Sequence, residues 1–310
     1  MAGNTNINVK PFLKWVGGKG QLVQRFSRFY PGELTTGQIE NYYEPFLGGG
    51  AVFFNIASNH KLKSAKLYDI NDELILTYQV VQKDVDKLMD FLERYRDYYL
   101  NLSYEKRKKY YYELRTNYNL QRFNIDYKKY SENWIPRAAQ VIFLNKTCYN
   151  GLFRVNSKGG FNSPAGDYKN PMIFDRENLA NASKLLSYAE IINADFKDFS
   201  VDEFEKSFIY FDPPYRPISS TANFTSYSKY EFKDVEQKQL ASLYKRLDRK
   251  GARLMLSNSD PKNIDPDDNF FDILYKDYNI IRIPTRRAVN SVGTSRGEIN
   301  EIVVTNYSVA

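Results

Sequence analysis

The sequence predicts an α/β fold, in which one doubly wound sheet is interrupted by a mostly helical insertion of roughly a hundred residues. Near the N-terminus the pattern alternates strand, glycine turn, helix, strand and helix, which is typical of such sheets. From about Asp84 to Asn145 the pattern becomes helical and polar. After this stretch, short apolar runs typical of strands return.

The first elements follow one another closely. "IENYYEPF" (Ile39–Phe46) predicts a strand that ends at three glycines, and "AVFFNIA" after them predicts a helix. "SAKLYDI" predicts a second strand, and "NDELILTYQVV" predicts a helix for which Asn71 is a suitable N-cap.

The insertion is predicted from three helical stretches, "KDVDKLMDFLERYRDYYLNL", "SYEKRKKYYYELR" and "NWIPRAAQVIFLNK". A loop-rich segment follows, "TCYNGLFRVNSKGGFNSPAGDYKNP". Later strands are predicted in "AEIINADF", "KSFIYFD", "RLMLSNS", "YNIIRIP" and "EIVVTNY". Loops of such sheets gather at the carboxyl ends of the strands, where ligands bind.

Composition narrows the class of protein. The net charge is +7, with 26 Tyr and 21 Phe, which suits a nucleic acid; a basic protein with a tyrosine-rich surface would explain it equally well. Cys148 and His60 are the only residues of their types, so we expect no disulfide, no metal site and no histidine-dependent hydrolase. The sequence has neither an apolar run of ~18 residues nor a signal-peptide pattern, which predicts a cytoplasmic protein without a membrane contact.

The glycine turn "YEPFLGGGAVFF" allows close approach of the backbone to a ligand at a helix N-terminus. Asp69 ends the next strand, where an acid can accept hydrogen bonds from ribose hydroxyls. These features predict an adenosine-containing cofactor, although a turn without a ligand is an alternative. NAD fits poorly, because Phe53 stands where the third glycine of the nicotinamide pattern belongs.

The stretch "FIYFDPPY" ends a buried strand at Asp212. Pro213 and Pro214 fix the backbone and lack N–H groups, so their carbonyls act only as acceptors. With Tyr215 as a stacking face, the Asp212 carboxylate and the Pro213 carbonyl match a planar group that bears an exocyclic amine. A proline turn without catalytic function is the alternative. Accepting both hydrogens of adenine N6 would localise its lone pair and let it attack an electrophilic methyl group.

Four segments in this order resemble the Dam and DpnII-type DNA adenine-N6 methyltransferases, α group: "PFLKWVGGKGQL", "EPFLGGGAVFF", "YDINDELI" and "FDPPY". The resemblance extends over nearly the whole chain. It implies a Rossmann-like fold that depends on S-adenosyl-L-methionine (AdoMet), with a mixed sheet. Residues 1–72 and 172–310 would form the catalytic domain, and residues 73–171 the target-recognition domain.

The resemblance also assigns roles to residues. Catalysis would rest on Asp212, Pro213, Pro214 and Tyr215. Trp15, Gly17 and Lys19 would lie beside the methionine part of AdoMet, Asp69 at its ribose, Asp212 near its methyl group, and Asp195 and Phe196 at its adenine. Glu44, Phe46, Gly48 and Gly50 would complete the cofactor site. DNA contacts are implied for Lys14, Tyr149, Asn150, Leu152, Arg154, Asn162 and, in "FTSY", Tyr227.

Two basic stretches have more than one interpretation. Arg154 could contact guanine O6 and N7, which would give specificity, or a phosphate, which would give only affinity. Asp167 departs from the pattern, since an Arg is common there in Dam. The segment from Arg282 to Gly297 is predicted to be a loop that contacts phosphates.

The resemblance is strongest to GATC-specific members of the family, in which the positions that match the implied DNA contacts read the sequence. It therefore implies a double-stranded DNA adenine-N6 methyltransferase specific for GATC that acts by base flipping. It would be a monomer or weak dimer in a bacterial, phage or nucleoid setting, and a cognate restriction endonuclease could accompany it without obligatory contact. The alternatives are methylation of cytosine N4, RNA or protein glutamine, and a catalytically silent DNA-binding homologue. A nicotinamide oxidoreductase is less favoured.

Overall fold

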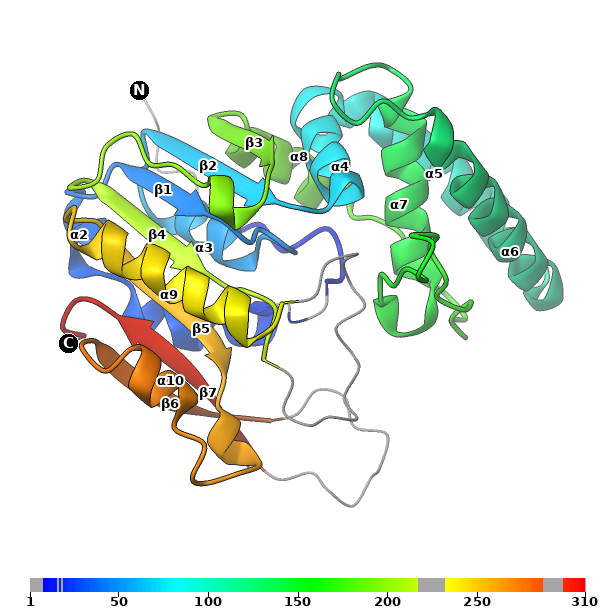
Figure 1. Ribbon diagram of the computed structural model, residues 1–310. Coiled ribbons are helices and arrows are strands. Elements are labelled where there is room, and N and C mark those ends of the chain that lie inside the picture. Colours follow the sequence, from blue (N-terminus) through cyan, green and yellow to red (C-terminus); the bar gives the residue numbers. More distant parts are fainter. Residues whose placement is uncertain (1–7, 16, 18, 217–231, 287–297, 310) are drawn as a thin grey trace.

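The computed structural model describes residues 8–15, 17, 19–216, 232–286 and 298–309. Within these residues, seven strands form one mixed sheet in the order β3-β2-β1-β4-β5-β7-β6 (Figure 1). All pairs are parallel except those of β7, which runs antiparallel to both β5 and β6. The strands are β1 (Asn41–Glu44), β2 (Ser64–Asp69), β3 (Ala189–Asn193), β4 (Ser207–Phe211), β5 (Arg253–Ser259), β6 (Asn279–Arg286) and β7 (Glu298–Thr305). The predicted α/β fold and each predicted strand are confirmed.

The order of the strands reverses between β1 and β4. From β1 the sheet continues to β2 and β3 on one side and to β4 and β5 on the other, so the direction in which strands are added to the sheet changes here. β1 and β4 pair in parallel, with Tyr43 opposite Ile209. Their carboxyl ends therefore lie side by side and bring Glu44 near Asp212, at the edge where open α/β sheets bind ligands.

Alternate strand residues enter two separate core clusters. Tyr42 and Phe208 face one side and pack in a cluster with helix α3 (Ala51–Asn59). Tyr43 and Ile209 face the other side, in a cluster with helix α9 (Asp234–Asp248), which lies across the sheet in Figure 1. Because both faces are covered, β4 is buried at every position, and "SFIYF" is continuously apolar after its serine.

The helices begin largely where the sequence indicates. Helix α4 (Asp72–Lys83) is capped by Asn71, whose side chain accepts a hydrogen bond from Leu74 N–H at 3.0 Å, as predicted. No helix within the described part of the chain is long and apolar enough to cross a membrane. The remaining α-helices are α1 (Val23–Phe26), α2 (Gly32–Thr36), α5 (Val85–Leu100), α6 (Tyr104–Gln121), α7 (Trp134–Thr147), α8 (Arg176–Leu186) and α10 (Phe270–Leu274).

The helical insertion extends from one end of the sheet, with α5, α6 and α7 packed together (Figure 1). A buried ion pair joins it to α4: the Arg137 guanidinium contacts both carboxylate oxygens of Glu73, and Tyr127 Oη donates to Glu73 Oε1 at 2.6 Å. The core cluster on this side of the sheet continues without a break into the insertion. The division of the chain at residues 72 and 172 stays a prediction.

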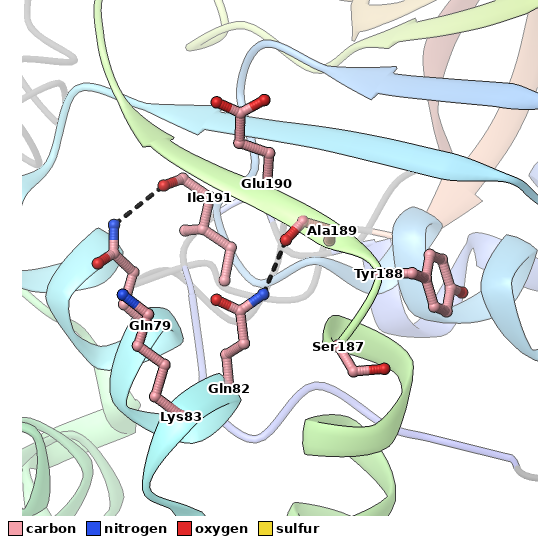
Figure 2. Close-up of a pocket in the computed structure, with 8 residues that line it drawn as sticks. All are labelled: Gln79, Gln82, Lys83, Ser187, Tyr188, Ala189, Glu190 and Ile191. Carbon is pink, nitrogen blue, oxygen red and sulfur yellow. Dashed lines mark hydrogen bonds between the residues drawn. The ribbon is translucent and has the colours of Figure 1, made fainter.

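Strand β3 is an edge strand that helix α4 protects. The side chain of Gln79 donates to the Ile191 carbonyl at 3.0 Å, and that of Gln82 donates to the Ala189 carbonyl at 2.7 Å (Figure 2). These carbonyls alternate along β3 and would otherwise be free to pair with another chain. A shallow pocket of about 450 Å³ lies between the two elements, and none of the predicted site residues lines it.

Candidate active site

Asp212 directly follows β4 at the carboxyl edge of the sheet. Its Oδ1 accepts a hydrogen bond from Ser257 Oγ at 2.9 Å and lies 3.1 Å from Lys19 Nζ. Its Oδ2 has no hydrogen-bond donor among the described residues. One oxygen is therefore fixed by the protein, and the other is available to a ligand.

Tyr215 and Glu301 complete a cluster around the buried Lys19 ammonium. The Tyr215 hydroxyl accepts a hydrogen bond from Lys19 and donates to Glu301 Oε2 at 2.7 Å. Lys19 Nζ also lies 3.4 Å from Glu301. Burial raises the pKa of Tyr215, so the phenol stays protonated and its ring is held in place through its hydroxyl.

The same cluster sets the charge at Asp212. Burial raises the pKa of the Asp212 carboxyl, the Lys19 ammonium lowers it, and the Glu301 carboxylate raises it. With all three groups ionised, one lysine and two carboxylates leave the cluster with a net negative charge. Such a cluster favours a positively charged ligand.

The two prolines after Asp212 differ in their environment. Pro213 is buried and Pro214 is exposed. The Pro214 carbonyl accepts a hydrogen bond from Gln237 Nε2 at 3.2 Å, whereas the Pro213 carbonyl has no donor among the described residues. Asp212 Oδ2 and the Pro213 carbonyl are thus two neighbouring acceptors that the described part of the protein leaves unused.

The glycine turn after β1 is closed by Asp69. Oδ2 of Asp69 accepts from Gly48 N–H at 3.0 Å, and Oδ1 accepts from Asn71 N–H at 2.9 Å. Burial raises the pKa of Asp69, which backbone N–H groups partly offset. A carboxylate has about four acceptor positions, and the N–H groups of Gly48, Asn71 and Ile70 use three of them, so one remains for a ligand hydroxyl. Gly50 has φ of +67°, and a Cβ there would lie 2.6 Å from Tyr78 Oη, so the turn requires glycine.

Glu44 lies at the end of β1 with only 2% of its surface exposed. Tyr42 Oη donates to Glu44 Oε2 at 2.9 Å, and a backbone hydrogen bond comes from Phe53. Burial raises the pKa of this carboxyl, and the negative charges of Asp212 and Asp69 raise it further. Glu44 is therefore held beneath the turn by the protein itself.

Three phenylalanines form an aromatic wall beside the turn. The Phe46 ring lies 5.4 Å from that of Phe196 and 5.7 Å from that of Phe232, measured between centroids. Phe196 begins a short 3₁₀ turn, in which the Asp195 carboxylate accepts from Lys197 N–H at 2.9 Å. The wall offers flat apolar contact to an aromatic ligand.

Trp15 lies between the glycine turn and the insertion. A Cβ on Gly48 would approach Trp15 Cδ1 to 3.0 Å, so the indole packs directly on the turn. The indole also stacks on Phe153 of the insertion, with ring centroids 5.3 Å apart. Gly17 has φ of +73°, which favours glycine.

Asn145 at the end of α7 joins two of the predicted DNA-contact segments. Its buried side chain accepts from Lys14 N–H at 2.8 Å and donates to the carbonyls of Lys14, at 2.7 Å, and Gly151, at 3.1 Å. Lys14 is thereby held next to the exposed side chains of Tyr149 and Asn150. Asn150 has φ of +57°, a conformation that asparagine tolerates better than most residues.

The other predicted DNA-contact residues lie on the adjoining hairpin. Asn162 N–H donates to the Arg154 carbonyl at 2.9 Å, and Val155 bridges Phe161 in antiparallel fashion. Within the described part of the chain, the Arg154 guanidinium forms no ion pair and no hydrogen bond. Leu152, which precedes the hairpin, is half-buried. The structure thus brings six of the seven predicted DNA-contact residues together; Tyr227 lies outside the described residues.

One further prediction, the phosphate-contacting loop, can be compared with the structure. Arg282 was expected in a phosphate-contacting loop, and this is wrong: it belongs to β6, and its guanidinium pairs with Asp260 at 2.9 Å and Asp272 at 2.8 Å. Residues 287–297 of that segment lie outside the described residues. Cys148 is fully buried, and burial raises the pKa of its thiol to about 12, which excludes it as a ready nucleophile.

Five residues of the site were not identified from the sequence. Ser257 and Asn258 interrupt an apolar strand in "LMLSNS", and Glu301 does so in "NEIVVT", so polar residues within buried strands were the available signal. Gln237 and Phe232 have no comparable signal, because a glutamine on a helix and a phenylalanine in a loop are ordinary.

Comparison with known proteins places these features in a family. The model of the D12 class N6 adenine-specific DNA methyltransferases matches residues 15–289. The type II methyltransferase M.MjaIII of Methanocaldococcus jannaschii is 48% identical, covering 97% of this chain and 100% of the relative. M1.LlaDCHI of Lactococcus lactis subsp. cremoris is 37% identical over 97% and 96% of the two chains. The DNA adenine methylase of Escherichia coli K12 is 29% identical over 95% and 94%.

The family match covers Asp69, Asp212 and the whole insertion, and the first of these relatives matches over its entire length. The chain therefore belongs to the D12 class of N6 adenine-specific DNA methyltransferases.

Proposed function

We propose that this enzyme transfers the methyl group of AdoMet to N6 of adenine in duplex GATC, directly and after the base has left the helix. The observation that carries this proposal is the pair of unused acceptors, Asp212 Oδ2 and the Pro213 carbonyl, beside the ring of Tyr215. A primary amine on a planar base has two hydrogens to donate, and this pair can accept both.

The residues of the site account for the reactivity of the amine. The lone pair of adenine N6 is delocalised into the ring, and accepting both hydrogens localises it on the nitrogen. Bound AdoMet would supply an electrophilic methyl group on a positively charged sulfur. The Asp212 carboxylate stabilises the positive charge that develops on N6, a contribution of about 2.7–4 kcal/mol for comparable groups. As the bond between N6 and the methyl group forms, the sulfur–methyl bond would break and leave a neutral thioether, and the proton that N6 gives up would pass to solvent.

The cofactor site fits AdoMet through three features of the chain. Asp69 retains an acceptor position for a ribose hydroxyl after closing the glycine turn. The wall of Phe46, Phe196 and Phe232 offers contact to an adenine ring. The net negative charge around Lys19 suits a ligand that bears a sulfonium.

Base flipping is supported by the position of the acceptors and the chemistry of the substrate. In duplex DNA, N6 of adenine donates to the paired thymine, so both hydrogens cannot reach protein acceptors inside the stack. Tyr215, fixed by its hydroxyl, provides a stacking face for the extruded base.

Specificity for GATC is proposed from the recognition segment. Lys14, Tyr149, Asn150, Arg154 and Asn162 lie on one surface, and the Arg154 guanidinium has no partner within the described residues. A free planar guanidinium suits bidentate contact with guanine, worth roughly 1–3 kcal/mol of discrimination. Two relatives are named type II methyltransferases, which favours a restriction–modification role.

The test is methyl incorporation from radiolabelled AdoMet into a GATC duplex and a duplex with the site scrambled, followed by digestion to identify the modified base. We expect N6-methyladenine in the GATC duplex, and a loss of about 10²–10³-fold in rate for Asp212→Ala. Undiminished incorporation by Asp212→Ala would refute its role. N4-methylcytosine, or DNA binding without turnover, would favour the alternative functions.

Base flipping is tested in a third duplex with 2-aminopurine at the target position. Its fluorescence should increase on binding if the base is flipped.

A further inference from the structure

A pair of buried amides holds the chain that follows the two prolines. Gln237 of α9 and Asn258 of β5 are both fully buried. Gln237 Nε2 donates to the Pro214 carbonyl at 3.2 Å, and Gln237 Oε1 accepts from Asn258 Nδ2 at 3.4 Å. Asn258 Oδ1 accepts in turn from the backbone N–H of Ser259 at 2.9 Å and of Arg216 at 3.4 Å.

The amides of Gln237 and Asn258 thus form a relay of hydrogen bonds between the Pro214 carbonyl and the Arg216 N–H. The direction of every hydrogen bond in this relay is determined by the backbone. Asn258 Oδ1 must face two backbone N–H groups, so Asn258 Nδ2 must point toward Gln237. The side-chain oxygen of Gln237 then faces Asn258, and its side-chain nitrogen faces Pro214. A buried amide that loses its hydrogen-bond partner is unfavourable, which disfavours any other orientation. The relay therefore has one low-energy arrangement.

The prolines explain why side chains are needed here. Pro213 and Pro214 have no N–H groups, so this stretch cannot be anchored by donating backbone hydrogen bonds as a strand is. The relay supplies an anchor on either side of Tyr215 instead, at the Pro214 carbonyl and at the Arg216 N–H.

The consequence concerns the neighbouring carbonyl. Because the Pro214 carbonyl is bound to α9, the orientation of the peptide that it shares with Tyr215 is fixed. Proline fixes φ near −65° at both positions, so few backbone rotations remain that could turn the Pro213 carbonyl. We propose that Gln237, supported by Asn258, is a positioning residue that keeps the Pro213 carbonyl directed at the amine of the substrate. This inference rests on the proposed function, in which that carbonyl accepts one amine hydrogen.

Two variants of Gln237 separate its donor from its acceptor. Gln237→Met removes both while keeping about the length of the side chain. Gln237→Glu, assayed above the pKa that burial raises, keeps an oxygen for Asn258 but has no hydrogen for Pro214. We expect both to lower the single-turnover rate of methyl transfer at saturating DNA and AdoMet by about 10–100-fold, as small misplacements of reacting groups do. The dissociation constants for DNA and AdoMet should change much less than the rate.

The matched control is Gln82→Met. Gln82 also donates to backbone carbonyls, those of Leu186 and Ala189, but at the far edge of the sheet. We expect it to lower the melting temperature as Gln237→Met does and to leave the rate unchanged. Combining Gln237→Met with Asn258→Leu should slow transfer little more than Gln237→Met alone, because the two amides act in series.

Three results would overturn the inference: an unchanged rate in both Gln237 variants, losses of binding that match the loss of rate, or an equal loss of rate in Gln82→Met. Identification of the methylated base in the wild-type reaction tests the proposed function separately. If the methylated group were another amine, such as cytosine N4, the ratio of variant to wild-type rates of methyl transfer would still decide the role of the relay.

Discussion

At the scale of single residues, Asp212 lies between charges of opposite sign. Lys19 Nζ is 3.1 Å from its carboxylate, and Glu301 shares the same ammonium at 3.4 Å. Burial raises the pKa of Asp212, the Lys19 charge opposes this rise, and the Glu301 charge adds to it. Asp212 is a full acceptor for the amine hydrogen only when its carboxyl is ionised, because protonation places a hydrogen on one of its oxygens. The rate of methyl transfer should therefore fall as the pH falls through this raised pKa.

The negative charge of Glu301 should set the position of this acid limb in the pH profile. Glu301→Gln removes the negative charge but keeps an oxygen for Tyr215 and Lys19, so the pKa of Asp212 should fall and the acid limb of the single-turnover rate should move to lower pH. Glu40→Gln is the control, because Glu40 precedes β1 at the opposite edge of the sheet and pairs with Lys63. An acid limb that stays in place, or moves upward, in Glu301→Gln would contradict the assignment.

At the scale of elements, the recognition segment and the N-terminal segment fit together through Gly151. Its φ is +65°, and a Cβ there would lie only 2.2 Å from Lys14 Cδ. Asn145 binds the backbone of both segments from α7. The position of the Lys14 side chain therefore depends on a glycine in a different element, and Trp15 continues from it to the glycine turn of the cofactor site.

Gly151→Ala tests this arrangement. It should cost about 1–2 kcal/mol of stability through the left-handed backbone, and it should also displace Lys14. We expect the affinity for a GATC duplex to fall about 10-fold or more, which corresponds to ~1.4 kcal/mol, while AdoMet affinity changes little. Gly37→Ala is the matched control, because its φ is +74° and a Cβ there meets nothing within 4 Å. Equal losses of DNA affinity in the two variants would show that strain alone is responsible.

At the scale of the whole molecule, local patterns in the sequence predict the sheet but not the contacts that complete the site. "FIYFDPPY" locates Asp212 at the end of a buried strand because apolar run, acid and prolines are adjacent in sequence. Glu301 is 89 residues from Asp212, and it reaches the site only because β7 is inserted antiparallel between β5 and β6. Arg282 was assigned to a loop because its segment is rich in cations, whereas its carboxylate partners, Asp260 and Asp272, lie outside that segment.

The continuous core indicates that the sheet and the insertion unfold together. Arg137 of α7 is buried against Glu73 of α4, within a core cluster that both parts share. Removing one partner leaves a buried charge, so Arg137→Met should lower the free energy of unfolding in urea by roughly 3–5 kcal/mol, and the double variant Glu73→Leu/Arg137→Met should recover much of it. Lys109→Met removes an exposed pair with Glu113 and should change little. Because the core is continuous, we expect the transitions by circular dichroism and by tryptophan fluorescence to coincide; Trp15 lies at the junction of the two parts and Trp134 lies within the insertion. Separate transitions, or a double variant no more stable than Arg137→Met, would show that this ion pair does not couple the insertion to the sheet.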